Sequence, residues 1–280
     1  MDKFFWYTRG MKKESIMKQS QAKKRDNAMT NKILMGLIAL VLGLLFLEIL
    51  IVHSKNEQQK NASNQVQTAR IMANGDLLYH DGLYMSALQA DGSYDFTENF
   101  TYVKPWLKQA DLVLGDFEGT INPDYPLSGY PLFNAPQSVT AAIKDAGYDV
   151  MDLAHNHILD SGLEGAFTTA DAFKEVGIDP VGVYEKPVRD KAPLLIKNVN
   201  GIKVAILSYA YGYNGLESNL TDKEVADHLS NLDEKRMKAE IQRAEKEADI
   251  TVIMPQMGVE YRLEPTDEQV KLYHKMIDWG

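Results

Sequence analysis

The longest apolar run in the chain covers residues 33–52 (ILMGLIALVLGLLFLEILIV), and its 20 residues contain one charge, Glu48. At about 1.5 Å of rise per residue, such a helix spans roughly the 30 Å hydrocarbon core of a bilayer. Glu48 lies four residues from the end of the run, from where a carboxylate can reach the interface. The pattern predicts one transmembrane helix.

A different pattern begins near residue 69, after the polar segment 53–68. Short apolar runs alternate with segments of helical period, which is typical of layered α/β folds. Asn200-Gly201 between two apolar runs predicts a hairpin. We expect strands at 69–74, 111–115, 149–154, 179–183, 193–199, 202–209 and 249–254, and helices at 135–146, 162–176, 233–247 and 266–278.

The charges add an orientation to this picture. Residues 1–32 contain nine Lys or Arg and three acids, whereas residues after 52 contain 21 Lys or Arg and 35 acids, a formal charge of −14. The positive-inside rule therefore predicts a cytoplasmic tail (1–32), a signal anchor (33–52), a flexible stalk (53–68) and an extracellular domain (69–280) in a single-pass protein of the cell membrane. Such an acidic domain argues against nucleic-acid binding.

The chain has no cysteine. Disulfides, thiolate metal sites, cysteine nucleophiles and a lipidated cysteine are therefore excluded. Any bound metal must use His, Asn, Gln or carboxylate ligands.

Polar side chains follow four of the predicted strands. They are Asp76 in NGDLLYH, Asp116 and Glu118 in LGDFEG, His155, Asn156 and His157 in LAHNH, and Gln256 and Glu260 in MPQMGVE. Loops at the carboxyl ends of neighbouring strands converge on one crevice in an α/β sheet. In LAHNH, His155 and His157 share one face and Asn156 takes the other, and Asp116 and Glu118 share a face if their strand persists.

Each of these groups alone has an ordinary explanation, such as a turn or an Asx cap. Together, oxygen and imidazole ligands suit a hard or borderline divalent cation such as Mn, Mg, Zn or Fe, and two such ions would favour phosphoester hydrolysis. Metal-dependent hydrolysis is therefore one hypothesis that the residues raise.

From Arg70 to the last residue the chain resembles the poly-gamma-glutamate capsule biosynthesis proteins of CapA/PgsA type, whose domain is similar to calcineurin-like metallophosphoesterases. The resemblance rests on an ordered series of motifs: GD at 75–76, ADLVLGDFEG at 110–119, FNAP at 133–136, AAIKDAGYDVMDLAHNHILDSGLEG at 141–165, VGIDPVGV at 176–183, NGIKVAILSY at 200–209 and GVEYRLEPTDEQ at 258–269. It implies an α/β layered sandwich of the metallophosphoesterase type behind the transmembrane helix.

The resemblance also implies roles for residues. Asp76, Glu118 and Asn156 match metal ligands, and His157 matches a second ligand or the proton donor to a leaving oxygen. Asp116 and His155 stand where the family more often has Asn. Gln256 occupies a position that is usually His, and a neutral amide is a poorer ligand than imidazole for Zn, Mn or Fe.

By the same comparison the chain stops before the family's next strand and a His-rich segment, so we expect the sandwich to be incomplete at the C-terminus. Such a loss would uncover a sheet edge and an apolar helix face.

Three functions follow from these observations. The first is a membrane-anchored factor that works with a membrane-bound polymer synthase complex in the export or attachment of an anionic capsule polymer. The second is a metal-dependent phosphoesterase or other hydrolase of cell-envelope substrates. The third is a catalytically inactive anchor or scaffold. The sequence favours the first and leaves catalysis open.

Overall fold

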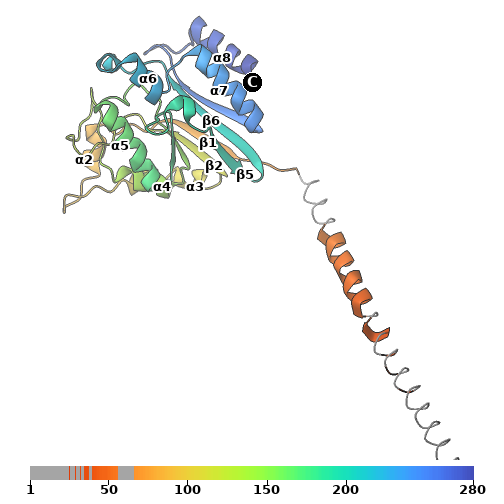
Figure 1. The fold of residues 1–280 in the computed structure, drawn as a ribbon. Coiled ribbons are helices and arrows are strands. Elements are labelled where there is room, and N and C mark those ends of the chain that lie inside the picture. Colours follow the sequence, from red (N-terminus) through yellow and green to blue (C-terminus); the bar gives the residue numbers. More distant parts are fainter. Residues whose placement is uncertain (1–24, 26–28, 30–31, 33–34, 38–39, 56–65) are drawn as a thin grey trace, which may run out of the picture. The chain divides into compact units, whose positions relative to one another are not determined.

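In the computed structural model, residues 25, 29, 32, 35–37, 40–55 and 66–280 are described (Figure 1). The chain divides into two compact units, Met1–Val66 and Gln67–Gly280. Most of the predicted basic tail (1–32) and most of the predicted stalk (56–65) lie outside the described residues.

In the first unit, a helix covers Met35–Lys55, two residues later at its start and three later at its end than the predicted span. Residues 33–34 and 38–39 lie outside the described residues, and every described side chain of the helix is exposed. A helix that is apolar all round is suited to lipid rather than water. By length and composition it is a candidate membrane span.

The second unit is built on two sheets. One is wholly parallel, in the order β1-β2-β3-β4. The other has the order β5-β6-β7, with β5 and β6 antiparallel and β6 and β7 parallel. The strands are β1 (Ile71–Asp76), β2 (Leu112–Asp116), β3 (Val150–Asp152), β4 (Asp179–Val181), β5 (Leu195–Val199), β6 (Ile202–Ala210) and β7 (Ile250–Gln256).

The predicted hairpin between β5 and β6 is present. Asn200 and Gly201 both have positive φ, 53° and 89°, as a two-residue hairpin turn with the native twist requires.

The helices of this unit are α2 (Asp81–Ser86), α3 (Lys104–Leu107), α4 (Val139–Ala146), α5 (Gly162–Glu175), α6 (Asp222–His228), α7 (Glu234–Glu247) and α8 (Asp267–Trp279), with short 3-10 turns η1 (Thr97–Phe100), η2 (Arg189–Lys191) and η3 (Leu216–Asn219). Thr266 caps α8 in a capping box. Its partner is Gln269, because the N3 side chain is the one that reaches back to the cap.

Alternation along the strands produces four layers. Leu112 and Leu114 of β2 pack with Val204 and Ile206 of β6 in a core between the two sheets. Val113 points to the opposite side, into the core under α4 and α5. Because successive side chains of a strand point to opposite faces of the sheet, β2 contributes side chains to both cores.

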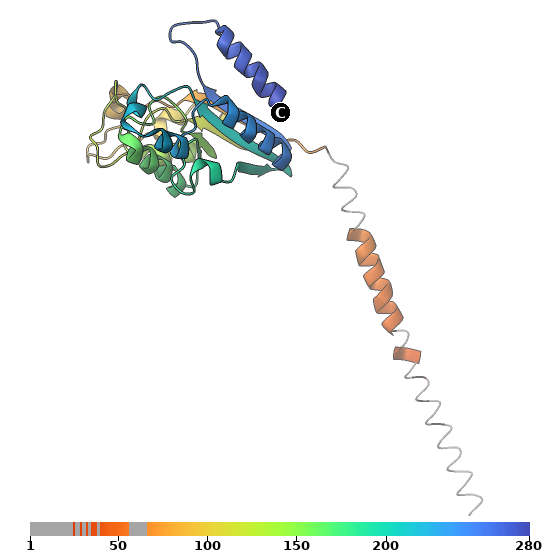
Figure 2. The same ribbon diagram turned by 45° about the horizontal axis from the view of Figure 1, so that its top comes forward.

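The second sheet repeats this arrangement on its outer side. Ala205 and Leu207 of β6 pack against Met237 and Ile241 of α7 and Met276 of α8. Figures 1 and 2 show α7 and α8 on this outer side and α4 and α5 on the other. The unit is therefore an α/β/β/α sandwich, in agreement with the predicted fold class.

Candidate metal and proton-transfer site

Three neighbouring strands of the parallel sheet end on aspartate in register. Asp76 of β1 pairs with Asp116 of β2, and Asp116 pairs with Asp152 of β3. Asp116 and Asp152 continue the alternate positions of Leu114 and Val150, whose side chains fill the space between the sheets. The sequence therefore places carboxylates at the mouth of the inter-sheet core.

Asp76 joins the acids that follow β2. Its carboxylate lies close enough to Asp116 and to Glu118 to raise the pKa of both carboxyls. Burial raises the pKa of Asp116 well above its ordinary value, and the charges of Asp152 and Asp76 raise it further. Burial likewise raises the pKa of Glu118, with Asp76 as the next cause. Carboxyl groups so close together cannot all carry a negative charge unless a cation neutralises them. They therefore share protons or bind a cation.

Among the described residues, no lysine or arginine compensates the charge of these carboxylates. No ion pair there joins Asp76, Asp116, Glu118 or Asp152 to Lys or Arg; Glu118 Oε1 lies 3.9 Å from His157 Nε2. In the same part of the chain, no three His, Asp or Glu side chains already frame a cation site.

The donors nevertheless fit a divalent cation. Asp116 Oδ1 is buried and has no hydrogen-bond partner, which is costly for a carboxylate oxygen. Carboxylate oxygens around Asp76 are the ligands that Mg and Mn prefer, and a nearby imidazole suits Zn, Mn or Fe. Asp76, Asp116 and Glu118 are the side chains that could hold the ion.

Asp152 belongs to this cluster, although sequence reasoning did not single it out. It is 3% exposed, and its Oδ1 accepts hydrogen bonds from Ala154 N, at 2.7 Å, and from the Ser208 hydroxyl of β6. Asp152 thereby links the two sheets directly beside Asp116. Its signal in the sequence was an acid at the end of an apolar strand, the same signal that marked Asp116.

The segment after β3 corrects one expectation. The strand ends at Asp152, and residues 155–160 form a turn. His155 and His157 therefore do not share a strand face. His155 is fully buried, its Nδ1 accepts the His157 N–H at 3.2 Å, and burial lowers its pKa to about 3. His155 is a neutral core side chain.

His157 faces the acids. Its Nδ1 lies 2.7 Å from Asp160 Oδ2, and its ring packs edge-on against Phe133 with centroids 4.7 Å apart. Burial lowers the pKa of His157, but the hydrogen bond and charge of Asp160, with the charges of Glu118 and Glu260, outweigh it and raise the pKa overall. Asp160 also accepts the Phe133 N–H at 2.6 Å, which fixes its carboxylate.

Asn156 points to the second sheet. Its backbone N–H donates to Gln256 Oε1 and its Oδ1 accepts from Gln256 Nε2, both at 2.7 Å. Its Nδ2 donates to Asn214 Oδ1 at 3.0 Å. The structure thus brings Gln256, at the end of β7, to the same mouth as the acids of the first sheet.

Asp160 and Asn214 are site residues that sequence reasoning missed. Asp160 follows His157 by three residues, a spacing that allows contact within one turn, so a signal was present. Asn214 lies in a loop after β6 with a positive φ of 55°, and only the tertiary structure places it beside His157.

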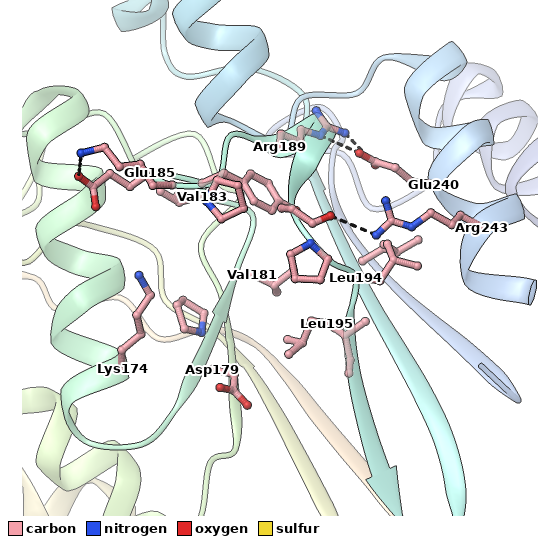
Figure 3. A pocket seen from close by; sticks show the side chains of 18 residues that line it. Lys174, Asp179, Val181, Val183, Glu185, Arg189, Leu194, Leu195, Glu240 and Arg243 are labelled. Carbon is pink, nitrogen blue, oxygen red and sulfur yellow. Dashed lines mark hydrogen bonds and ion pairs between the residues drawn. The ribbon is translucent and has the colours of Figure 1, made fainter. Parts of the chain in front are cut away.

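A separate cavity of about 340 Å³ opens between β4, β5 and α7 (Figure 3). Its most buried polar group, Arg189, forms a two-pronged pair with Glu240, with both N–O distances 2.9 Å. The Tyr209 hydroxyl also donates to Glu240, at 2.8 Å. Because these groups satisfy one another, the cavity wall ties η2, β6 and α7 together, and none of the candidate site residues lines it.

Two known proteins that are similar to this chain carry the name CapA. CapA of Bacillus anthracis, a capsule biosynthesis protein, is 32% identical over 190 residues, which cover 65% of this chain and 45% of that protein. The PGA biosynthesis protein CapA of Bacillus subtilis is 26% identical over 275 residues, 96% of this chain and 70% of that protein. The match thus spans less than half the length of the first relative.

A putative 5'-nucleotidase from Staphylococcus aureus is a more distant match among solved structures, with a TM-score of 0.48 and 15% identity over 75% of this chain and 42% of that one. The model of the family described as bacterial capsule synthesis protein PGA_cap matches residues 70–280, which is the whole of the sandwich. The chain belongs to this family of bacterial capsule synthesis proteins.

Proposed function

We propose that this chain is a membrane-anchored factor for the biosynthesis or export of an anionic capsule polymer of the poly-gamma-glutamate type. In this proposal the helix at Met35–Lys55 is the anchor, the residues before it are cytoplasmic, and residues 69–280 form an extracellular domain. The basic residues of 1–32 support this orientation. The Bacillus subtilis relative is named a PGA biosynthesis protein, and this name supports the proposed type of polymer.

The observation that carries the proposal is the row of in-register aspartates, Asp76, Asp116 and Asp152, with Glu118 beside it and no Lys or Arg paired to it among the described residues. We propose that Asp76, Asp116 and Glu118 hold one divalent cation. A bound cation would neutralise these carboxylates and act as a Lewis acid toward an oxygen of the polymer or ester. Without it, the acidic domain would repel an anionic polymer.

The chain's own residues would then hold the proton donor in place and deliver a proton to the substrate. Asp160 holds the His157 ring by a 2.7 Å contact, and this favours the imidazolium. His157 is therefore placed to give a proton to an oxygen of a substrate bound beside Glu118. This arrangement supports a second candidate function, a metal-dependent hydrolase of cell-envelope esters.

Elemental analysis of the full chain, purified in detergent, tests the metal site. We expect bound Mn, Mg, Zn or Fe in the wild-type chain and its loss in Asp116→Asn, with Asp171→Asn, an exposed pair partner of Lys174, as the matched control. Metal in neither protein, or equal metal in both, would overturn the proposed site.

Two further measurements separate the functions. Capsule polymer on cells that carry Asp116→Asn should fall if the site serves assembly, and a membrane-bound polymer synthase complex should copurify with the chain. Hydrolysis of a generic phosphodiester that His157→Ala abolishes would favour the hydrolase. Normal capsule with Asp116→Asn, but none without the protein, would point to an anchor or scaffold.

A further inference from the structure

The two halves of the site differ in how their polar atoms are satisfied. On the side of β1 and β2, Asp116 Oδ1 is buried without a partner and the acids contact one another. On the side of β7, Asn156 is held by Gln256 at two points. This difference decides on which of the two sides a bound cation is more strongly stabilised.

The Gln256 contact has a fixed direction. The backbone N–H of Asn156 can only donate, so Gln256 must present Oε1 to it. Gln256 Nε2 then faces Asn156 Oδ1, at 2.7 Å. The carboxamide oxygen of Asn156, which is its only side-chain atom able to bind a metal, is therefore turned toward a hydrogen-bond donor.

The other amide groups on this side are engaged as well. Asn156 Nδ2 donates to Asn214 Oδ1 at 3.0 Å, and Asn214 Nδ2 lies 3.4 Å from both ring nitrogens of His157. Neutral amides that satisfy one another gain little from a cation, and a metal there would break short hydrogen bonds. The crowded acids gain charge neutralisation from the same ion.

Building on the proposed function, we infer that Gln256 makes this a one-cation site. The ion lies with Asp76, Asp116 and Glu118. Gln256 and Asn214 hold Asn156 by hydrogen bonds, and these bonds prevent Asn156 from binding a second metal ion. Gln256 acts here as a specificity-determining residue for metal number, through Asn156 rather than by contact with the ion.

Manganese binding to the full chain in detergent tests this inference. We expect calorimetric titration to give one Mn²⁺ per wild-type chain, and the electron paramagnetic resonance spectrum to be that of an isolated ion. Gln256→His removes the two-point contact and supplies imidazole, so we expect two ions and a spin-coupled spectrum. Gln137→His, at an exposed glutamine, is the matched control and should keep one ion.

The outcomes distinguish this inference from the proposed function. No manganese in the wild type would overturn the proposed metal site itself. Two coupled ions in the wild type would overturn the one-cation inference and leave the metal site standing. One ion in both wild type and Gln256→His would overturn the role of Gln256. Gln256→Glu, which keeps the side-chain shape, provides the same comparison if Gln256→His fails to fold.

Discussion

Gln256 and Asn156, which are 100 positions apart in the sequence, hold each other through two hydrogen bonds of 2.7 Å across the mouth between the sheets. One bond uses the Asn156 backbone and the other its side chain. The pair therefore joins the end of β7 to the turn after β3 and fixes both at once.

The Gln256 contact contributes to stability. Asn156 is 8% exposed, so Gln256→Ala leaves a largely buried donor and acceptor without their partner. Such a loss costs about 1 to 2 kcal/mol. Urea unfolding of the metal-free chain should show this decrease, whereas Gln137→Ala should change the free energy of unfolding little. Equal effects of the two substitutions would contradict the role of the contact.

The acid cluster predicts a pH dependence of stability in the absence of metal. The pKa of Asp116 is raised in the folded chain, mainly by burial. Its stabilising effect is complete below the pKa of the unfolded chain, about 3.9, and is lost as pH rises toward the folded value. We expect the melting temperature in EDTA to fall from pH 4 toward pH 8.

Asp116→Asn should remove part of this fall, because an amide stays neutral at every pH. At pH 8 in EDTA we expect the variant to be more stable than the wild type by about 1 to 3 kcal/mol, and at pH 4 to be nearly equal. Asp171→Asn is the control on the surface. A variant that is less stable than the wild type at pH 8 would contradict the prediction. It would show that other groups of the folded chain stabilise the negative charge of Asp116.

Asp160 should control the protonation of His157. Asp160→Asn keeps an acceptor for the Phe133 N–H but removes the charge that raises the His157 pKa. Since burial lowers that pKa, we expect it to fall in the variant. Titration of the histidine ring signals by NMR measures the shift, with Asp171→Asn as control. An unchanged His157 pKa would exclude Asp160 as its partner.

The Arg189–Glu240 pair should be a major structural contact of the second sheet. The Arg189 side chain is 1% exposed and that of Glu240 is 20% exposed. Glu240→Ala leaves a buried guanidinium without its carboxylate, which costs about 3 to 5 kcal/mol. Glu234→Ala, which breaks the exposed pair with Lys275, should cost less than about 1 kcal/mol. Urea unfolding of the two variants provides the comparison.

The N-terminal helix should anchor the chain. Leu44→Arg places a charge near the middle of Met35–Lys55, where it disfavours insertion by about 2.5 to 3.5 kcal/mol. We expect less protein in the carbonate-washed membrane fraction, and Leu44→Ala should be retained. Full retention of Leu44→Arg would argue against this helix as the span.

Much of the fold follows from local patterns in the sequence. The expected strand at 202–209 is observed as β6 (Ile202–Ala210), and the expected helix at 233–247 as α7 (Glu234–Glu247). Each of these elements matches one simple periodicity, and the Asn200-Gly201 turn is local as well. The short helices α2 and α6 were missed, because six or seven residues carry little periodic signal.

Local sequence patterns are enough to place polar side chains at the strand ends, because alternation along β2 and β3 puts Asp116 and Asp152 in line with core residues. The division of the strands into two sheets, and the contacts of Gln256 and Asn214 with Asn156, arise only in the folded chain. Such contacts depend on the order and packing of the sheets, which no local period encodes.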